Sequence, residues 1–217
     1  MNQGYKSLKE AAFAEYVERK SVFYSTASPV FTEEEAIDLI NSVKKKYSDA
    51  THNVYAYIIR ENNISRYSDD GEPHGTAGIP VLDMLRKEGL TNVAVVVTRY
   101  FGGILLGTGG LVRAYTASAK LALDKGGIVF WLPHGCLKVN ASYGDYQRLA
   151  YLFKTEGVIV KDIEYTDTVR AECLTEEQKL DRIIGLIPET TGGRAEIEIL
   201  PSRYLPTDKG VNANENN

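Results

Sequence analysis

Apolar residues recur at helical spacing in one early segment of the chain. The spacing predicts a helix over about residues 33–47, and its apolar positions are Ala36, Leu39, Ile40, Val43 and Tyr47. Thr32 and Glu35 have the spacing of a capping box, in which each side chain accepts a backbone N–H of the other residue. Lysines at 44–46 follow in the last turn, where cations complement the helix dipole. The helix is therefore expected to begin and end within this stretch.

Short segments rich in β-branched and aromatic residues predict strands around this helix. They are residues 13–17, 21–25, 54–60, 64–68 and 92–98, and the fourth is expected to return antiparallel to the third. The last is a continuous apolar run, which is typical of a strand covered on both faces. Two more helices are expected, one from Pro80 to Gly89 and one over 111–125, where small residues allow close approach to a sheet.

The pattern changes after residues 126–133, which we interpret as a domain boundary. The segments beyond it predict strand, helix, strand, strand, helix and strand, at 137–143, 145–156, 158–165, 169–174, 176–187 and 195–200. Thr175 and Gln178 suggest a second capping box. This βαββαβ order is that of a ferredoxin-like domain. We therefore expect domains at 1–130 and 134–200, followed by a flexible tail at 201–217 with too little apolar content to pack.

The composition is that of an ordinary globular protein, with 43% hydrophobic and 25% charged residues among 217. No apolar run approaches the ~20 residues of a membrane-spanning helix, and the first residues do not resemble a secretory signal. Cys136 and Cys173 are expected to be reduced, buried hydrophobes, with a redox pair as the alternative. We therefore expect a cytoplasmic protein with no membrane contact and no disulfide.

The formal net charge is -4, and it is unevenly distributed. Residues 1–132 hold 15 Lys and Arg against 15 Asp and Glu, whereas residues 133–217 hold 10 against 14. A protein that holds duplex DNA through phosphate contacts alone usually has a net basic face. Any nucleic-acid role would therefore depend on a local basic patch or on shape.

A glycine-rich segment, RYFGGILLGTGGLVRAY, begins at Arg99 and follows the most apolar predicted strand. Glycines allow close backbone approach, and the backbone N–H groups of a helix start can hold an anion such as phosphate. Arg99 and Arg113 bracket the segment and can add charge-assisted hydrogen bonds. It is neither a Walker A loop nor G-x-G-x-x-G. Two interpretations stay open, an anion or ligand contact and a tight turn packed against the sheet.

A second candidate is the turn-rich loop SDDGEPHGTAG at 68–78. Its side chains Asp69, Asp70, Glu72 and His74 can in principle hold a divalent metal or act as acids and bases. The spacing fits neither an EF-hand nor H-E-x-x-H, and such carboxylates also cap local backbone. The sequence favours the structural alternative.

Tyrosines and arginines also accumulate in the first half of the chain. Tyrosine stacks on unpaired bases and arginine contacts phosphate, so a single-stranded RNA surface is possible, although tyrosine is equally an ordinary strand residue. The residues concerned are Tyr55, Tyr57, Arg60, Arg66, Tyr67, Arg99, Tyr100, Phe101 and Arg113. Nucleophilic catalysis has little support, because there is no G-x-S-x-G elbow and His134 beside Cys136 is a weak signal.

With THNVYAY, SDDGEPHGTAG and NVAVVVTRYFGGILLGTGGLVRAY, the chain closely resembles bacterial, YigZ-like members of the IMPACT family, from about residue 5 to 200. The resemblance implies an α+β protein whose N-terminal domain has the left-handed βαβ fold of domain IV of elongation factor G. It also implies a ferredoxin-like βαββαβ C-terminal domain. The motif residues here are Asp69, Asp70, Gly71, Glu72, Pro73, Gly75, Thr76, Arg99, Tyr100, Phe101, Gly102, Gly103, Gly107, Thr108, Gly109, Gly110 and Arg113.

Eukaryotic members of this family regulate translation through an initiation-factor kinase pathway and carry a further domain that this sequence lacks. The resemblance therefore implies a translation or RNA association and not the kinase-linked role. The leading hypothesis is a non-catalytic regulatory protein that binds RNA, the ribosome or a protein partner and needs no metal or cofactor. Under this hypothesis, Arg99 and Arg113 contact phosphate or acidic groups, and the glycines shape the contact. Tyr100 and Phe101 supply surface for stacking.

Two alternatives use the same segments differently. In the first, the chain is a metal- or nucleotide-dependent small-molecule enzyme, with Asp69, Asp70 and Glu72 opposite the glycine-rich segment. In the second, it is a protein-interaction module whose motif residues maintain an unusual turn. A shared cleft between the SDDGEP loop and the glycine-rich segment would favour the first alternative.

Overall fold

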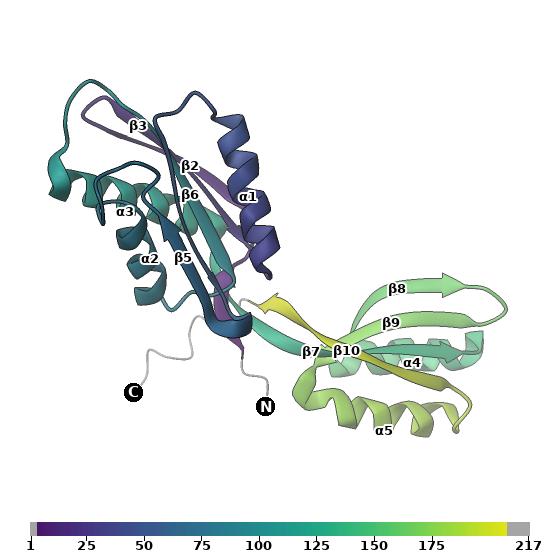
Figure 1. Ribbon diagram of the computed structural model, residues 1–217. Coiled ribbons are helices and arrows are strands. Elements are labelled where there is room, and N and C mark those ends of the chain that lie inside the picture. The colour runs from purple at the N-terminus through teal and green to yellow at the C-terminus, as the bar shows by residue number, and fades with distance from the viewer. Residues whose placement is uncertain (1–3, 208–217) are drawn as a thin grey trace. The chain divides into compact units, whose positions relative to one another are not determined.

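The computed structural model describes residues 4–207, which form two compact units (Figure 1). The first unit runs from Tyr5 to Phe130 and the second from Trp131 to Thr207. Each unit has its own sheet and helices, so each is described separately.

The first unit contains a five-stranded antiparallel sheet with the strand order β2-β3-β6-β4-β5. Its strands are β2 (Ala12–Glu18), β3 (Ser21–Pro29), β4 (His52–Ile59), β5 (Ile64–Ser68) and β6 (Val93–Tyr100). The five predicted strands are confirmed, including the antiparallel return of β5 along β4. A 3-10 turn (Glu61–Asn63) joins these two. The strand β1 (Tyr5–Leu8) is not part of this sheet but pairs with β7 (Ile128–Ala141), and after it Lys9 donates its N–H to the Gly127 carbonyl beyond the end of α3.

Helices cover both faces of this sheet (Figure 1). They are α1 (Glu33–Lys46) on one face, and α2 (Gly78–Lys87) and α3 (Gly107–Gly126) on the other. On β6, Val93, Val95 and Val97 pack toward α2 and α3, whereas Ala94 and Val96 pack toward α1. The continuous apolar run of β6 therefore fills two cores, as predicted for a strand covered on both faces.

Two helical crossovers in this unit have opposite hands. Strands β3 and β4 are parallel, with β6 between them, and α1 connects them. Strands β5 and β6 are parallel, with β4 between them, and α2 connects them in the reverse direction. A half-turn about the sheet normal superposes the strands of one connection on those of the other. If both crossovers had the same hand, their helices would therefore lie on the same face of the sheet, but they lie on opposite faces. One crossover is therefore left-handed, against the usual rule, as the resemblance implied.

Local capping explains where the helices of this unit begin. Thr32 accepts the N–H of Glu35 as predicted, whereas the Glu35 carboxylate accepts the N–H of Phe31, one residue before the N-cap, instead of that of Thr32. Helix α3 starts four residues earlier than expected, at Gly107. The glycines at 107–110 thus form its first turn, where N–H groups lack intrahelical partners anyway.

The second unit is ferredoxin-like, with strand order β10-β7-β9-β8 and two helices. Its elements are β7 (Ile128–Ala141), α4 (Tyr143–Glu156), β8 (Ile159–Tyr165), β9 (Val169–Glu176), α5 (Leu180–Thr191) and β10 (Glu196–Thr207). The predicted order of strands and helices is confirmed. Leu149 and Phe153 of α4, and Ile183 and Ile187 of α5, pack on one face of the sheet.

Two predictions for this unit are wrong at its C-terminal end. Thr175 belongs to β9, its hydroxyl has no hydrogen-bond partner among the described residues, and a 3-10 turn (Glu177–Lys179) precedes α5, so no capping box forms there. The flexible tail expected from residue 201 instead continues as β10 to Thr207, because its backbone pairs with β7 and Arg203 bonds Glu172. Residues 208–217 lie outside the described part.

Both cysteines are fully buried and free, as expected for small hydrophobes. Burial raises the pKa of the Cys173 thiol to about 12, which keeps it unreactive at neutral pH. Within residues 4–207, no helix has the length and apolar character required to cross a membrane.

Candidate functional site

The SDDGEP loop meets the glycine-rich segment through a buried ion pair. Glu72, whose side chain is 3% exposed, accepts a hydrogen bond from Arg99 Nη1 and another, at 2.7 Å, from the Tyr115 hydroxyl of α3. His52 Nε2 lies 3.8 Å from the same carboxylate oxygen. Burial, followed by the neighbouring carboxylate, raises the Tyr115 pKa, so this hydroxyl stays a donor. The cluster joins β6, α3 and the loop before α2 into one unit.

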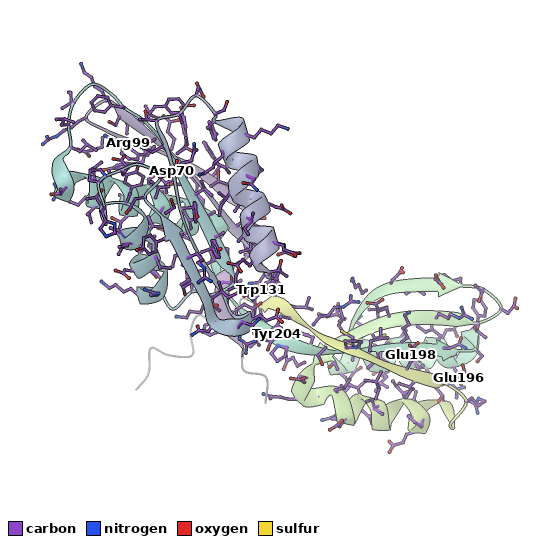
Figure 2. The ribbon with its side chains drawn as sticks, in the orientation of Figure 1. Asp70, Arg99, Trp131, Glu196, Glu198 and Tyr204 are labelled. Atoms are coloured by element: carbon purple, nitrogen blue, oxygen red, sulfur yellow. The ribbon has the colours of Figure 1, made fainter. Side chains whose placement is uncertain are left out.

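Arg99 is the cationic member of this cluster and lies near Asp70 in the same part of the unit (Figure 2). Its side chain is 6% exposed, its Nη2 lies 3.4 Å from Ser21 Oγ, and its guanidinium stacks over Phe23 and Phe101. The guanidinium thus faces the interior, where the sequence had suggested contact with a ligand phosphate. The structure gives Arg99 a positioning role instead, because burying an arginine requires internal partners.

Asp69 caps the start of α2. Its carboxylate accepts backbone N–H groups of Gly75 (2.8 Å), Ala77 (3.2 Å) and Gly78 (2.8 Å). These are donors that a helix start leaves without intrahelical partners, and the negative charge also suits the positive end of the helix dipole. Thr76 belongs to the same turn and donates its hydroxyl to the Pro73 carbonyl. Asp69 and Thr76 therefore shape the loop.

Asp70 ties the same loop to β4 and α1. It accepts the Asn53 N–H at 2.7 Å and the Lys44 ammonium at 2.9 Å. Partial burial alone would raise the pKa of Asp70, but these two hydrogen bonds and the charges of Lys44 and His52 outweigh it and lower that pKa. The carboxylate therefore stays ionised in the folded protein at neutral pH.

All three carboxylates of the loop are thus engaged by the protein itself. Residues 4–207 contain no group of three or more His, Cys, Asp or Glu side chains placed to hold a metal ion. His74 is 90% exposed and lies 3.7 Å from Asp69. The arrangement gives no support to a metal centre built on this loop.

The first glycines of the signature satisfy steric demands of the fold. A Cβ on Gly102 would lie 2.0 Å from the Lys20 carbonyl carbon, because the β2–β3 turn crosses directly over it. Gly103 and Gly107 have φ values of +81° and +70°. These glycines therefore determine the backbone path of the segment between them.

The φ angles of Gly103 and Gly107 are both positive. Both values lie in the left-handed region, which glycine adopts without strain. No protein atom would meet a Cβ at either position within 4 Å, so conformation and not crowding favours glycine at both.

The loop between these glycines exposes apolar side chains. Leu105 is 82% exposed, Phe101 48% and Ile104 41%. Just before them, the Tyr100 hydroxyl donates to Asp49 at 2.8 Å, and this bond is the main cause that raises the Tyr100 pKa to about 12. Single exposed apolar residues are ordinary, but three of them in one short loop form a patch suited to contact with a partner.

The first turn of α3 lies directly after this loop. Its N-cap residue, Leu106, has no side chain that can accept a hydrogen bond, and no acidic residue occurs in the turn. The backbone N–H groups of Gly107, Thr108 and Gly109 are thus left without a side-chain cap among the described residues. Such a helix start favours a negatively charged group.

Arg113, one turn further along α3, lines a groove of about 600 Å³. The groove lies between α3, the β2–β3 turn and the end of α2, and its charged lining residues are Glu18, Arg19, Lys87, Glu88, Arg113 and Lys120. Lys120 is paired with Glu88 and Asp124, each at 3.0 Å. Within the described residues no carboxylate forms an ion pair with Arg113, so its exposed guanidinium is available to a ligand.

The two sequence candidates are therefore joined internally but do not line this groove together. Gly110 and Arg113 line it, whereas no residue of the SDDGEP loop does. Sequence reasoning missed Tyr115 and Ser21, which complete the Arg99 cluster, and Arg19, which faces the groove. In the sequence these residues stand out only by lying within or next to predicted elements, because their partners in the folded protein are far away along the chain.

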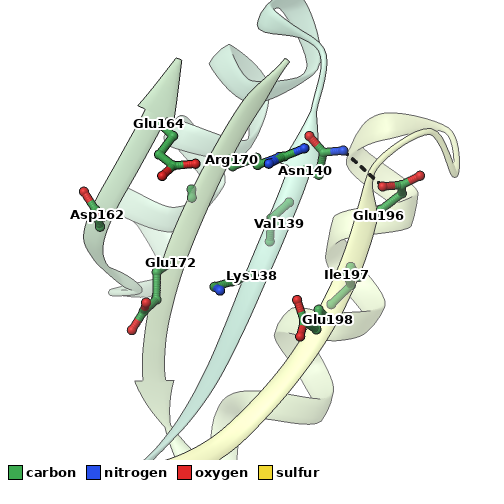
Figure 3. A pocket seen from close by; sticks show the side chains of 11 residues that line it. Lys138, Val139, Asn140, Asp162, Glu164, Arg170, Glu172, Glu196, Ile197 and Glu198 are labelled. Carbon is green, nitrogen blue, oxygen red and sulfur yellow. Dashed lines mark hydrogen bonds between the residues drawn. The ribbon is translucent and has the colours of Figure 1, made fainter. Parts of the chain in front are cut away.

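The second unit has a hollow of its own on the open face of its sheet, with a volume of about 580 Å³ (Figure 3). Five acidic residues line it, with Lys138 and Arg170 as the cations. The acidic residues are Asp162, Glu164, Glu172, Glu196 and Glu198. Glu172 bonds Arg203 and Glu196 bonds Asn140. This face matches the negative balance of the C-terminal sequence.

The fold and the signature define a class of protein: a two-domain α+β protein whose first sheet has a left-handed crossover and a glycine-rich segment after its central strand. Comparison with known families agrees, since the Impact N-terminal domain matches residues 19–123 and a domain of unknown function, DUF1949, matches residues 139–194. The chain is also 38% identical to "IMPACT family member YvyE" of Bacillus subtilis (strain 168) over 213 residues, which cover 98% of this chain and 97% of that protein. It therefore belongs to the IMPACT family.

Two other similar proteins match about half of this chain. "IMPACT family member YigZ" of Escherichia coli (strain K12) is 42% identical over 108 residues, 48% of this chain and 53% of that protein. "Protein IMPACT" of Oryctolagus cuniculus is 37% identical over 112 residues, 50% of this chain and 35% of that protein. A crystal structure described as that of a hypothetical protein has a TM-score of 0.60 at 25% identity, covering 93% of this chain and 99% of the other.

Proposed function

We propose that this protein is a non-catalytic, translation-associated regulatory protein that binds RNA on the ribosome through the exposed half of its glycine-rich signature. The observation that carries the proposal is the juxtaposition of three features at one end of the first unit. They are the exposed apolar loop at 101–106, the uncapped start of α3, and the unpaired guanidinium of Arg113. Together they offer an apolar contact beside donors for a phosphate.

The charge distribution supports a local contact. The chain as a whole carries a net charge of -4, so long-range attraction to RNA is weak. Around the groove, however, Lys87 and Arg113 are cations, while the groove acids Glu18 and Glu88 are paired with Arg19 and Lys120. Recognition would thus depend on a small number of positioned donors.

The buried half of the signature supports the same function indirectly. Arg99, Glu72 and Tyr115 hold β6, the SDDGEP loop and α3 together, and this fixes where the glycine-rich loop leaves the sheet. On this view Asp69, Asp70, Glu72, Thr76 and Arg99 position the binding surface, and Tyr100, Phe101, the glycines and Arg113 form it.

The alternative of a protein-interaction module is favoured by one observation, the 82% exposure of Leu105 in an apolar loop. A protein partner would bury Phe101, Ile104 and Leu105 and would make little use of Arg113. The enzyme alternative has less support, because the carboxylates of the SDDGEP loop are engaged in capping and ion pairing.

Cosedimentation of the full chain with ribosomes, together with crosslinking to RNA, tests the proposal. We expect Arg113→Ala to reduce both signals, whereas Arg66→Ala, which removes an exposed arginine on the far edge strand β5, should leave them unchanged. Equal recovery of wild type and Arg113→Ala would count against the assigned contact. Loss with Leu105→Ser but not with Arg113→Ala would favour a protein partner.

A further inference from the structure

Half of one face of the first sheet is left open. Helix α1 packs on β4 and β6, on the opposite face from α3 (Figure 1). Phe13 and Val17 of the edge strand β2 are 44% and 54% exposed, and both lie on the face of the sheet on which α1 packs. Their neighbours Ala14 and Tyr16 point the other way, into the core beneath α3. The outer half of the α1 face is therefore a sheet surface without a helix above it.

Four aromatic side chains lie together on this face, and Tyr24 contacts each of the other three. Phe13 of β2 stacks with Tyr24 of β3 at 5.7 Å between ring centroids, and Tyr24 stacks with Tyr47 at the end of α1 at 5.6 Å. Tyr100 of β6 meets Tyr24 edge to face at 6.0 Å. We call Phe13, Tyr24, Tyr47 and Tyr100 the aromatic row. Three of its members come from adjacent strands, so the fold holds their rings in register.

Cations lie along and beside the aromatic row. Lys46 places its ammonium 5.5 Å from the Phe13 ring centroid and 4.8 Å from that of Tyr47. Arg19 and Lys20 form the exposed β2–β3 turn at one end of the row. The acidic residues nearby are Glu15, which pairs across from Tyr24, and Asp49, which accepts from Tyr100. Arg19 pairs with Glu18 and lines the groove beside α3, so Lys46 and Lys20 balance Glu15 and Asp49 here, although the whole chain is acidic.

We propose that the aromatic row binds the bases of single-stranded RNA, with Lys46 and Lys20 contacting its phosphates. In this row Phe13 is exposed and the three tyrosines are partly exposed, and rings on adjacent strands can offer stacking surfaces that tolerate any base. A neutral apolar partner would make no use of the cations that border the row. The proposal rests on the proposed function, since it names the form of RNA bound and adds a second contact surface to the same unit.

Binding of a fluorescently labelled short oligouridine to the full chain, measured by anisotropy, tests the row. Phe13→Leu removes the ring but keeps apolar volume, and we expect it to weaken binding by about 5- to 150-fold, the usual effect of losing one stacking ring. Phe13→Tyr keeps an aromatic ring and should bind oligouridine more tightly than Phe13→Leu. A purely structural role of Phe13 would not require this dependence of binding on a ring. Tyr67→Ala is the matched control, because Tyr67 is a 40% exposed tyrosine on the opposite edge strand β5.

Charge variants provide a second readout. Lys46→Ala should lower the salt dependence of oligouridine binding by about one phosphate contact. Glu15→Gln should tighten binding, because it removes an acidic side chain that lies beside Tyr24. An RNA duplex should bind more weakly than the single strand, since its bases are not available for stacking.

The outcomes separate this inference from the proposed function. If Phe13→Leu binds oligouridine like the wild type while Arg113→Ala binds more weakly, the aromatic row is excluded and the groove remains. If Phe13→Leu weakens binding and Arg113→Ala does not, the row is supported and the groove assignment fails. If the wild-type chain binds no oligouridine but still cosediments with ribosomes, the row is excluded while the proposed function stands.

Discussion

The two arginines of the glycine-rich signature have opposite environments, although they lie only fourteen positions apart in one motif. Arg99 is 6% exposed and engaged with Glu72 and Ser21, whereas Arg113 is exposed and lines a groove. A single sequence motif can therefore contain both buried residues that position a surface and exposed residues that form it. The difference predicts that the buried half of the signature controls folding and the exposed half controls binding.

Substitution of Arg99 should have the largest effect on stability. Arg99→Ala leaves the Glu72 carboxylate buried without its cation, and breaking a buried pair in this way typically costs about 3–5 kcal/mol. Urea denaturation of the full chain would measure it. Arg113→Ala is the matched control and should change the free energy of unfolding by less than about 0.5 kcal/mol. Similar losses for both variants would contradict the division between the two halves.

The glycines should divide in the same way. Gly102→Ala places a Cβ 2.0 Å from the Lys20 backbone, and overpacking of this kind costs about 1–3 kcal/mol. Gly109→Ala, in the first turn of α3, meets no protein atom nearer than 3.7 Å. Alanine also has the higher helix propensity, so Gly109→Ala should be neutral or stabilising by up to about 1 kcal/mol. Thermal unfolding of the two variants, followed by circular dichroism, checks this contrast.

Asp69 should have a smaller effect than Arg99, because it acts as a helix cap. Asp69→Ala removes the acceptor of three backbone N–H groups at the start of α2, and loss of such a cap costs about 0.5–2 kcal/mol. Asp69→Asn keeps an acceptor oxygen and should recover part of the loss. An unchanged melting temperature in Asp69→Ala would show that other groups hold this turn.

The pH dependence of Asp70 should be the smallest effect. Its pKa is lowered in the folded state, so ionised Asp70 stabilises the fold above its ordinary pKa of 3.8, and this contribution is lost as the pH falls through the folded-state pKa. The stability gap between wild type and Asp70→Asn should therefore be constant near neutral pH and narrow below about pH 4. Urea titrations at a series of pH values would measure the gap, and a gap that widens on acidification would contradict the ion pair.

The sequence predicted most elements of the fold because their signals are local. The Thr32 helix cap and the apolar run of β6 needed no knowledge of distant residues. The left-handed crossover came only from the family resemblance, since handedness has no signal in periodicity. The continuation of β10 past residue 200 was missed because pairing of its backbone with β7 stabilises it despite low apolar content.

The candidate site was predictable in position but not in detail. Arg99, Glu72 and the glycines were all identified, yet whether a charged side chain points inward depends on partners such as Tyr115, forty-three positions from Glu72. The aromatic row was missed for the same reason. Phe13, Tyr24 and Tyr47 lie in separate elements, and only the register of the sheet brings them together.

Hydrogen exchange at the uncapped start of α3 can show whether a ligand is bound there. Amide protons at Gly107, Thr108 and Gly109, which precede the first intrahelical hydrogen bond, should exchange with deuterated solvent quickly in the free protein. A phosphate seated there would accept them and slow their exchange, while amides in the centre of β6 would exchange slowly in either state. Hydrogen exchange at three consecutive residues would thus read out binding at the helix start, even for a ligand whose identity is unknown.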